Sequence, residues 1–128
     1  MTGTINTAER KLYDLCFLEQ MDDKNFIVQI IVLFLHDTHN DLGDMKRAFD
    51  ANDCDTVYRT AHKLKSSTGM LQANALFTIL EKIEKIAKAG RATRQLDELL
   101  QTAQYEFDQL KPALELHIRE IDNYKNDN

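Results

Sequence analysis

The chain has 128 residues, which is the length of one domain with its own hydrophobic core. Its 21 acidic and 16 basic residues are spread along the chain and give a net charge of −5, which excludes a general attraction to nucleic acid or to an anionic membrane. Only four glycines and one proline interrupt a composition rich in good helix formers, so we predict one all-α domain over residues 1–128.

The cysteines and the longest apolar run indicate the cellular compartment. Cys16 and Cys54, the two cysteines, both lie among apolar residues, which is typical of reduced core thiols in a cytoplasmic protein. The apolar run from Phe26 to Leu35 is much shorter than the roughly 20 residues that span a membrane, and no signal-peptide pattern is evident. We therefore expect a cytoplasmic protein whose partner is another protein or a small anion.

The first two helices are predicted between residues 7 and 51. Thr7 is a candidate N-cap for a short first helix, and the apolar positions of this helix are Leu12, Leu15, Cys16, Leu18 and Met21. Asp22 or Asp23 then caps a long second helix from about Lys24 to Ala51. The apolar stripe of this helix is Ile27, Ile31, Leu35, Thr38, Leu42, Met45 and Phe49. Its first half is apolar nearly all round, so we expect the first helix to cover its outer side.

The third and fourth helices carry regular apolar stripes. Asn52 or Asp53 caps the third helix, which ends near residues 69–71. Its stripe is Cys54, Val57, Ala61, Leu64, Thr68 and Leu71. The fourth helix runs from about Asn74 to Gly90, a residue type that accepts the positive φ of a helix end. Its stripe is Leu76, Leu80, Ile83 and Ala87.

A fifth helix begins at about Thr93, and Pro112 inside its pattern should kink or divide it. Its stripe is Leu96, Leu99, Leu100, Ala103, Phe107, Leu110, Leu114, Ile118 and Ile121. Residues 1–6 and 122–128 are expected to fray. Four long helices with short connections predict an antiparallel up-down-up-down four-helix bundle, with the short first helix across one end.

One histidine of the third helix lies outside the core stripe. Because each helical residue advances by about 100°, His62 points roughly 120° away from the centre of that stripe. Tyr58, Ser66 and Gly69 share its face, and Lys65 lies about 60° to one side. An exposed polar residue on a solvated face is the simplest interpretation of such a histidine. The small side chains that follow it favour another, an open approach for an incoming phosphoryl donor.

The chemistry of such a site needs few groups. A neutral imidazole is a nucleophile near pH 7, and the phosphoryl group that it accepts carries about two negative charges. Lys65 can offset that charge, and the hydroxyls of Ser66 and Ser67 can donate hydrogen bonds to the phosphoryl oxygens. A hydrogen-bond acceptor for the other ring nitrogen would fix the tautomer; Glu84 on the fourth helix is the better candidate and Glu81 the weaker one.

These residues resemble the histidine-containing phosphotransfer (HPt) domains of multistep His-Asp phosphorelays. The signature "AH.LK" is present as Ala61, His62, Leu64 and Lys65, and a small-residue stretch and the helix "L...IEKIAKAG" follow it. The resemblance extends over most of the chain. It implies a four-helix bundle that accepts a phosphoryl group on His62 from a receiver-domain aspartyl phosphate and passes it to another receiver aspartate.

The resemblance also implies roles for the neighbours of His62. The lysine that the family carries three residues after the histidine is Lys65 here, and Glu84 falls where the family places Gln or Glu to hold the histidine ring. Ser66 stands where the family usually has glycine, which adds a hydroxyl and slightly crowds the approach. The partners implied are receiver domains of response regulators or hybrid histidine kinases. The domain needs no cofactor of its own, because Mg²⁺ sits in the acidic pocket of the receiver.

Other functions remain open at this point. A non-catalytic helical interaction module would have the same helical pattern, and only His62 distinguishes it. A metal-binding bundle is disfavoured, because His36, His39 and His117 lack the inward Glu-x-x-His pairs of such proteins. An autonomous kinase is excluded, because the chain has no phosphate-binding loop.

The docking surface and the assembly state are less defined by the sequence. Tyr58, Met70, Phe17 and Met21 are candidates for an apolar rim on which a receiver docks. We expect a monomer, since a single-site shuttle does not need a dimer. The identity of the receivers and the direction of transfer stay open, as does the choice between a free-standing shuttle and a domain of a hybrid kinase.

Overall fold

The computed structural model describes residues 11–127, with side chains for residues 11–123. It contains five helices: α2 (Cys16–Glu19), α3 (Lys24–Asp50), α4 (Cys54–Met70), α5 (Asn74–Lys88) and α6 (Arg94–Asp127). Residues 11–127 contain no strand. The predicted all-α class is therefore confirmed.

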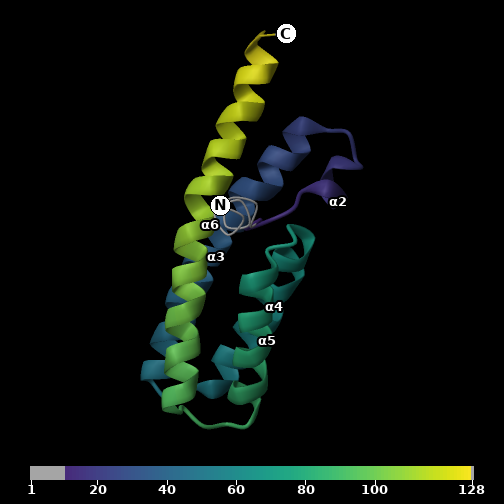
Figure 1. Cartoon of the computed structure of the whole chain (residues 1–128). Coiled ribbons are helices and arrows are strands. Elements are labelled where there is room, and N and C mark those ends of the chain that lie inside the picture. Colours follow the sequence, from purple (N-terminus) through teal and green to yellow (C-terminus); the bar gives the residue numbers. More distant parts are fainter. Residues whose placement is uncertain (1–10, 128) are drawn as a thin grey trace, which may run out of the picture.

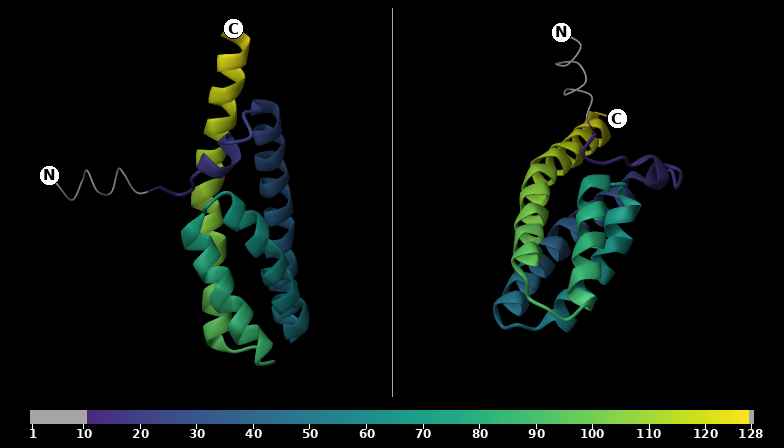
Figure 2. Two further views of the ribbon diagram at one scale, coloured as in Figure 1. Left: turned by 90° about the vertical axis from the view of Figure 1, so that its right-hand side faces the viewer. Right: turned by 60° about the horizontal axis from the view of Figure 1, so that its bottom comes forward.

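The four long helices form an antiparallel bundle (Figure 1). α3 packs against α4 and α6, and α5 packs against the same two helices from the opposite corner. α2 lies against the start of α3, at the end of the bundle where α4 turns into α5, and the last turns of α6 extend beyond that turn (Figures 1 and 2). The bundle and the position of the short extra helix agree with the prediction.

Polar side chains and one glycine define the ends of the helices. The carboxylate of Asp23 accepts a hydrogen bond from the Phe26 amide at 3.0 Å, and Asp53 accepts one from Thr56 at 3.1 Å. Gly90 has a φ of 83° after the end of α5, a conformation that favours glycine. The bounds of α3, α4 and α5 therefore lie within one or two residues of the predicted ones.

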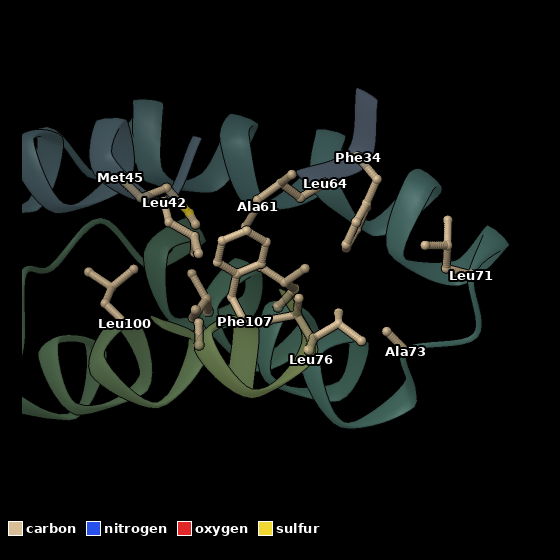
Figure 3. Packing of buried hydrophobic residues seen from close by; sticks show 14 of the residues in the cluster. Phe34, Leu42, Met45, Ala61, Leu64, Leu71, Ala73, Leu76, Leu100 and Phe107 are labelled. Carbon is tan, nitrogen blue, oxygen red and sulfur yellow. The ribbon is translucent and has the colours of Figure 1, made fainter. Parts of the chain in front are cut away.

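The core runs along the centre of the bundle, and Figure 3 shows Phe107 of α6 among core residues from the other three long helices. Its ring meets the ring of Phe34 edge to face, with the centroids 6.4 Å apart. The predicted stripes of α4 and α5 are buried at every position. On α3 the predicted stripe is displaced slightly, because Phe34 and Ala48 are buried while Leu35 and Phe49 are half-buried.

The predicted first helix is mostly wrong. Thr7 lies outside the described residues, and residues 11–15 are not helical. The backbone of this segment is held by other parts of the fold, because the Asp14 amide donates to the Leu71 carbonyl at 2.9 Å. The Tyr13 hydroxyl lies 3.1 Å from Nδ1 of His117 on α6. These long-range hydrogen bonds replace the local ones of a helix.

The short α2 leaves side chains exposed that were expected to be covered. Val32 and Leu33 on the outer side of α3 are 51% and 56% exposed, so the expected cover by the first helix is wrong. Cys16 is also exposed, which corrects its assignment as a core thiol, whereas Cys54 is buried as predicted. Neither cysteine forms a disulfide.

α6 continues without a break through Pro112, so the expected division of this helix does not occur. The proline removes the hydrogen bond to the carbonyl of residue 108, and both Pro112 and Asp108 lie on the exposed side of α6, where water can bond that carbonyl. The helix extends to Asp127, through most of the segment 122–128 expected to fray, while residues 1–6 lie outside the described part. Within residues 11–127, the helices are too short or too polar to cross a membrane.

Candidate functional site

His62 is presented to solvent by the middle of α4. Its side chain is 66% exposed, while Ala61 and Leu64 on either side of it are buried in the core. The packing of α4 against α5 brings the ring beside Glu84 of α5. His62 therefore lies off the core stripe, as its position on the helix predicts.

Glu84 of α5 holds both His62 and Lys65. One carboxylate oxygen, Oε2, is hydrogen-bonded to Nδ1 of His62, and the other, Oε1, lies 2.7 Å from Nζ of Lys65. The Glu84 side chain is only 14% exposed, so this contact is shielded from water on most sides. A carboxylate only accepts hydrogen bonds, so Nδ1 is the ring nitrogen that carries the proton of this contact. In the neutral form of the ring, this tautomer leaves the lone pair on Nε2.

The charges in this cluster support one another. The hydrogen bond from Lys65 lowers the pKa of Glu84 below its ordinary value; burial opposes this shift, and the contact with His62 adds to it. The same hydrogen bond is the main reason that the pKa of Lys65 is raised. Glu84 is therefore a carboxylate and Lys65 an ammonium ion at neutral pH.

Tyr58 forms one wall of the site. Its ring stacks on the His62 ring with the centroids 6.2 Å apart and an angle of 22° between the planes. An open groove of about 240 Å³ begins at Tyr58 and continues between the start of α4 and the end of α5, where Asp55, Ala87, Lys88 and Gly90 complete its lining. The imidazole is thus supported on one side by Tyr58 and held at Nδ1 by Glu84.

The two serines of the predicted site lie on different sides of α4. Ser66 is exposed and lies one turn after His62, on the same face of α4. Ser67 points about 140° away from His62 around the helix. Its hydroxyl donates to the Leu64 carbonyl at 3.3 Å. The structure therefore brings Ser66 near His62 and turns Ser67 away.

Gly69 has a different neighbour from the one expected. It lies nearly two turns after His62, and a Cβ atom added to it would lie 3.5 Å from Cε2 of Phe77. The open side of Gly69 thus faces the Phe77 ring of α5. The weaker candidate Glu81 acts electrostatically on Lys65 and is not hydrogen-bonded to His62.

Phe77 of α5 is a neighbour of Lys65 that the sequence does not single out. Nζ of Lys65 lies over its ring, 5.8 Å from the centroid. Phe77 precedes Glu84 by seven residues, about two helical turns, and so shares its face of α5, but spacing within α5 does not show which side chains of α4 it meets. The predicted apolar stripe of α5 contains Leu76 and not Phe77.

The remaining candidates lie away from the groove. His36 is exposed on α3, with Nε2 at 3.2 Å from Nδ2 of Asn40. His117 is hydrogen-bonded to the Tyr13 hydroxyl. No group of three or more metal-ligating side chains occurs in the described part of the chain. Phe17 and Met21 are exposed and Met70 is half-buried, and their part in a docking rim stays a prediction.

Comparisons with known proteins place this geometry in a family. The family model described as Hpt domain matches residues 29–123, well over half of the chain. A similar solved structure is that of histidine-containing phosphotransfer protein B (HptB) from Pseudomonas aeruginosa PAO1, with a TM-score of 0.80 at 18% identity, covering 88% of this chain and 98% of that one. A search of curated protein sequences finds no match. The match to the family model shows that this chain belongs to the Hpt domain family, the histidine phosphotransfer proteins of phosphorelay signalling.

Proposed function

We propose that His62 is the residue that carries the phosphoryl group, received from the aspartyl phosphate of one receiver domain and given to the aspartate of another. Hpt domains interact with receiver domains in phosphorelays, and this chain is a member of that family. The observation that carries the assignment is the hydrogen bond between Nδ1 of His62 and Glu84 on an otherwise exposed ring. In the neutral ring this contact leaves Nε2 unprotonated, and the exposure of the ring leaves it accessible.

The proposed transfer needs no proton to be removed from the attacking atom. The lone pair of Nε2 attacks phosphorus, the P–N bond forms, and the bond between phosphorus and the aspartate oxygen breaks, which returns the receiver carboxylate. The phosphorylated ring keeps its proton on Nδ1 and gains positive charge. Glu84 stabilises that charge, because its carboxylate already accepts the Nδ1 hydrogen. The reverse sequence delivers the group to the second receiver.

Lys65 and Ser66 are the proposed ligands of the phosphoryl oxygens. Lys65 is a cation on the next turn of α4, and a phosphoryl dianion competes with Glu84 for it. The Ser66 hydroxyl is exposed on the face of His62 and can donate a hydrogen bond. We expect smaller contributions from Ser67, which points away, and from Gly69, which faces Phe77.

The remaining parts of the proposal concern partners and surroundings. The receivers are domains of response regulators or hybrid histidine kinases, and the Mg²⁺ that assists transfer is held in their acidic pocket. The chain itself works as a cytoplasmic monomer without a cofactor. A receiver would dock over the groove beside Tyr58, where the imidazole is accessible.

The test is transfer from phosphorylated receiver domains to the wild-type chain, to His62→Gln and to His36→Gln. We expect an acid-labile, alkali-stable label on the wild type and on His36→Gln, because His36 lies on another helix. His62→Gln should remain unlabelled. Equal labelling of His62→Gln would overturn the assignment. A wild type that binds receivers but is never labelled would favour the non-catalytic interaction module.

A further inference from the structure

Lys65 of α4 is in contact with Phe77 of α5, where the two helices pack together. The Lys65 ammonium lies over the Phe77 ring, 5.8 Å from its centroid, and 2.7 Å from Oε1 of Glu84. The Lys65 side chain is 23% exposed, whereas that of Lys63, two residues earlier on α4, is 65% exposed. The Lys65 side chain therefore lies between an aromatic face and a carboxylate, instead of extending into water.

We infer that Phe77 is a positioning residue for Lys65, and that its ring keeps the ammonium ion beside Glu84 and His62 before the phosphoryl group arrives. This inference rests on the proposed roles of His62 and Lys65. A free lysine side chain on a helix surface has many rotamers, and ordering it costs conformational entropy. The contact with Phe77 orders Lys65 before transfer, so less conformational entropy is lost in the transfer step itself.

Gly69 gives the Phe77 ring its place against α4. The ring packs beside Gly69, where an added Cβ atom would lie 3.5 Å from Cε2, an ordinary contact distance that leaves no room for a longer side chain. A long side chain at residue 69 would displace the ring from the position under the ammonium ion. Gly69, one turn after Lys65, therefore affects the position of Lys65 indirectly, because it leaves room for the Phe77 ring.

The inference is tested by Phe77→Leu and by Phe77→Tyr, which keeps the aromatic face. With a phosphorylated receiver as donor, we expect Phe77→Leu to slow phosphoryl transfer or to shorten the lifetime of the phosphohistidine about two- to fivefold, the range of a partly exposed cation–π contact. Phe77→Tyr should keep most of the wild-type transfer rate and phosphohistidine lifetime. Phe49→Leu is the matched control, because it removes a similar contact with Lys46, 5.7 Å from that ring, on α3 instead of α4 and α5.

A double-mutant cycle separates positioning from a general structural effect. In a Lys65→Met background, Phe77→Leu should change the transfer rate and the lifetime no further, because the ring acts through the ammonium ion. An equal loss in both backgrounds, or no loss with Lys65 intact, would overturn the inference while leaving the role of His62 untouched.

A second measurement needs no phosphoryl donor. The Hε protons of Lys65 in the unphosphorylated protein should resonate upfield of those of Lys63, because they lie over an aromatic face, and Phe77→Leu should remove that shift. An unshifted Lys65 would overturn the inference whatever the kinetics. A wild type that accepts no label but shows the shift would instead overturn the proposed function, and the positioning role with it.

Discussion

The carboxylate of Glu84 holds His62 with one oxygen and Lys65 with the other. A glutamine at this position has one acceptor oxygen and an amide group that donates, so it can hold the ring but cannot accept from both partners equally. It also has no charge to balance the phosphorylated imidazole. Glu84 thus links the orientation of the ring to the position of the lysine.

A pH series on the stability of Glu84→Gln tests this link. The pKa of Glu84 is lowered in the folded protein, so its stabilising contribution is present above the unfolded value of about 4.3 and is lost as the pH falls through the folded pKa. The wild type should therefore be more stable than Glu84→Gln at pH 7, and the difference between their unfolding midpoints in urea should shrink below about pH 4. A difference that is the same at pH 7 and pH 3 would contradict the contacts of Glu84.

The residues of the site differ in how far the sequence predicts them. His62, Lys65 and Glu84 follow from helical spacing and from the family signature, and the structure brings all three together. Phe77 and the neighbour of Gly69 do not, because which side chain fills the space beside a glycine depends on the rotation of α5 against α4. Helical periodicity gives a direction within one helix and does not give that relative rotation.

At the scale of the elements, two glycines have opposite reasons to be present. Gly69 lies within α4 with open space that a Cβ atom can occupy at ordinary contact distance, while Gly90 has a φ of 83°. We expect Gly69→Ala to stabilise the protein by about 0.5–1 kcal/mol through helix propensity. Gly90→Ala should destabilise it by about 1–2 kcal/mol, because alanine disfavours a left-handed backbone.

Urea unfolding of the two glycine variants measures both effects against the wild type. Each variant adds the same methyl group near a helix end, so the opposite signs isolate the backbone conformation. Destabilisation of both would indicate that Phe77 resists even a methyl group at residue 69. Stabilisation of both would contradict the positive φ of Gly90.

The helices themselves were predictable where local signals agree. Asp23 and Asp53 cap α3 and α4, and regular stripes define the buried faces of α4 and α5. The segment before α2 was not predictable, because the hydrogen bonds that hold Tyr13 and Asp14 come from residues far along the chain. The unbroken course of α6 through Pro112 likewise depends on solvent at one carbonyl, which periodicity does not reveal.

At the scale of the whole molecule, the bundle brings distant residues together on one outer face. His62 and Glu84 are 22 residues apart in the chain and meet because α4 and α5 are antiparallel neighbours. The core behind them is continuous across the four long helices (Figure 3). The imidazole is therefore carried on a rigid scaffold, which orients it without a loop that must close.

The most direct test of this account is to locate the phosphoryl group by NMR of the phosphorylated protein with ¹⁵N-labelled histidine. The account predicts a P–N bond at Nε2 of His62 and a proton retained on Nδ1, because Glu84 accepts the Nδ1 hydrogen. Phosphoryl on Nδ1 of His62, or on any of the other histidines, His36, His39 and His117, would contradict it.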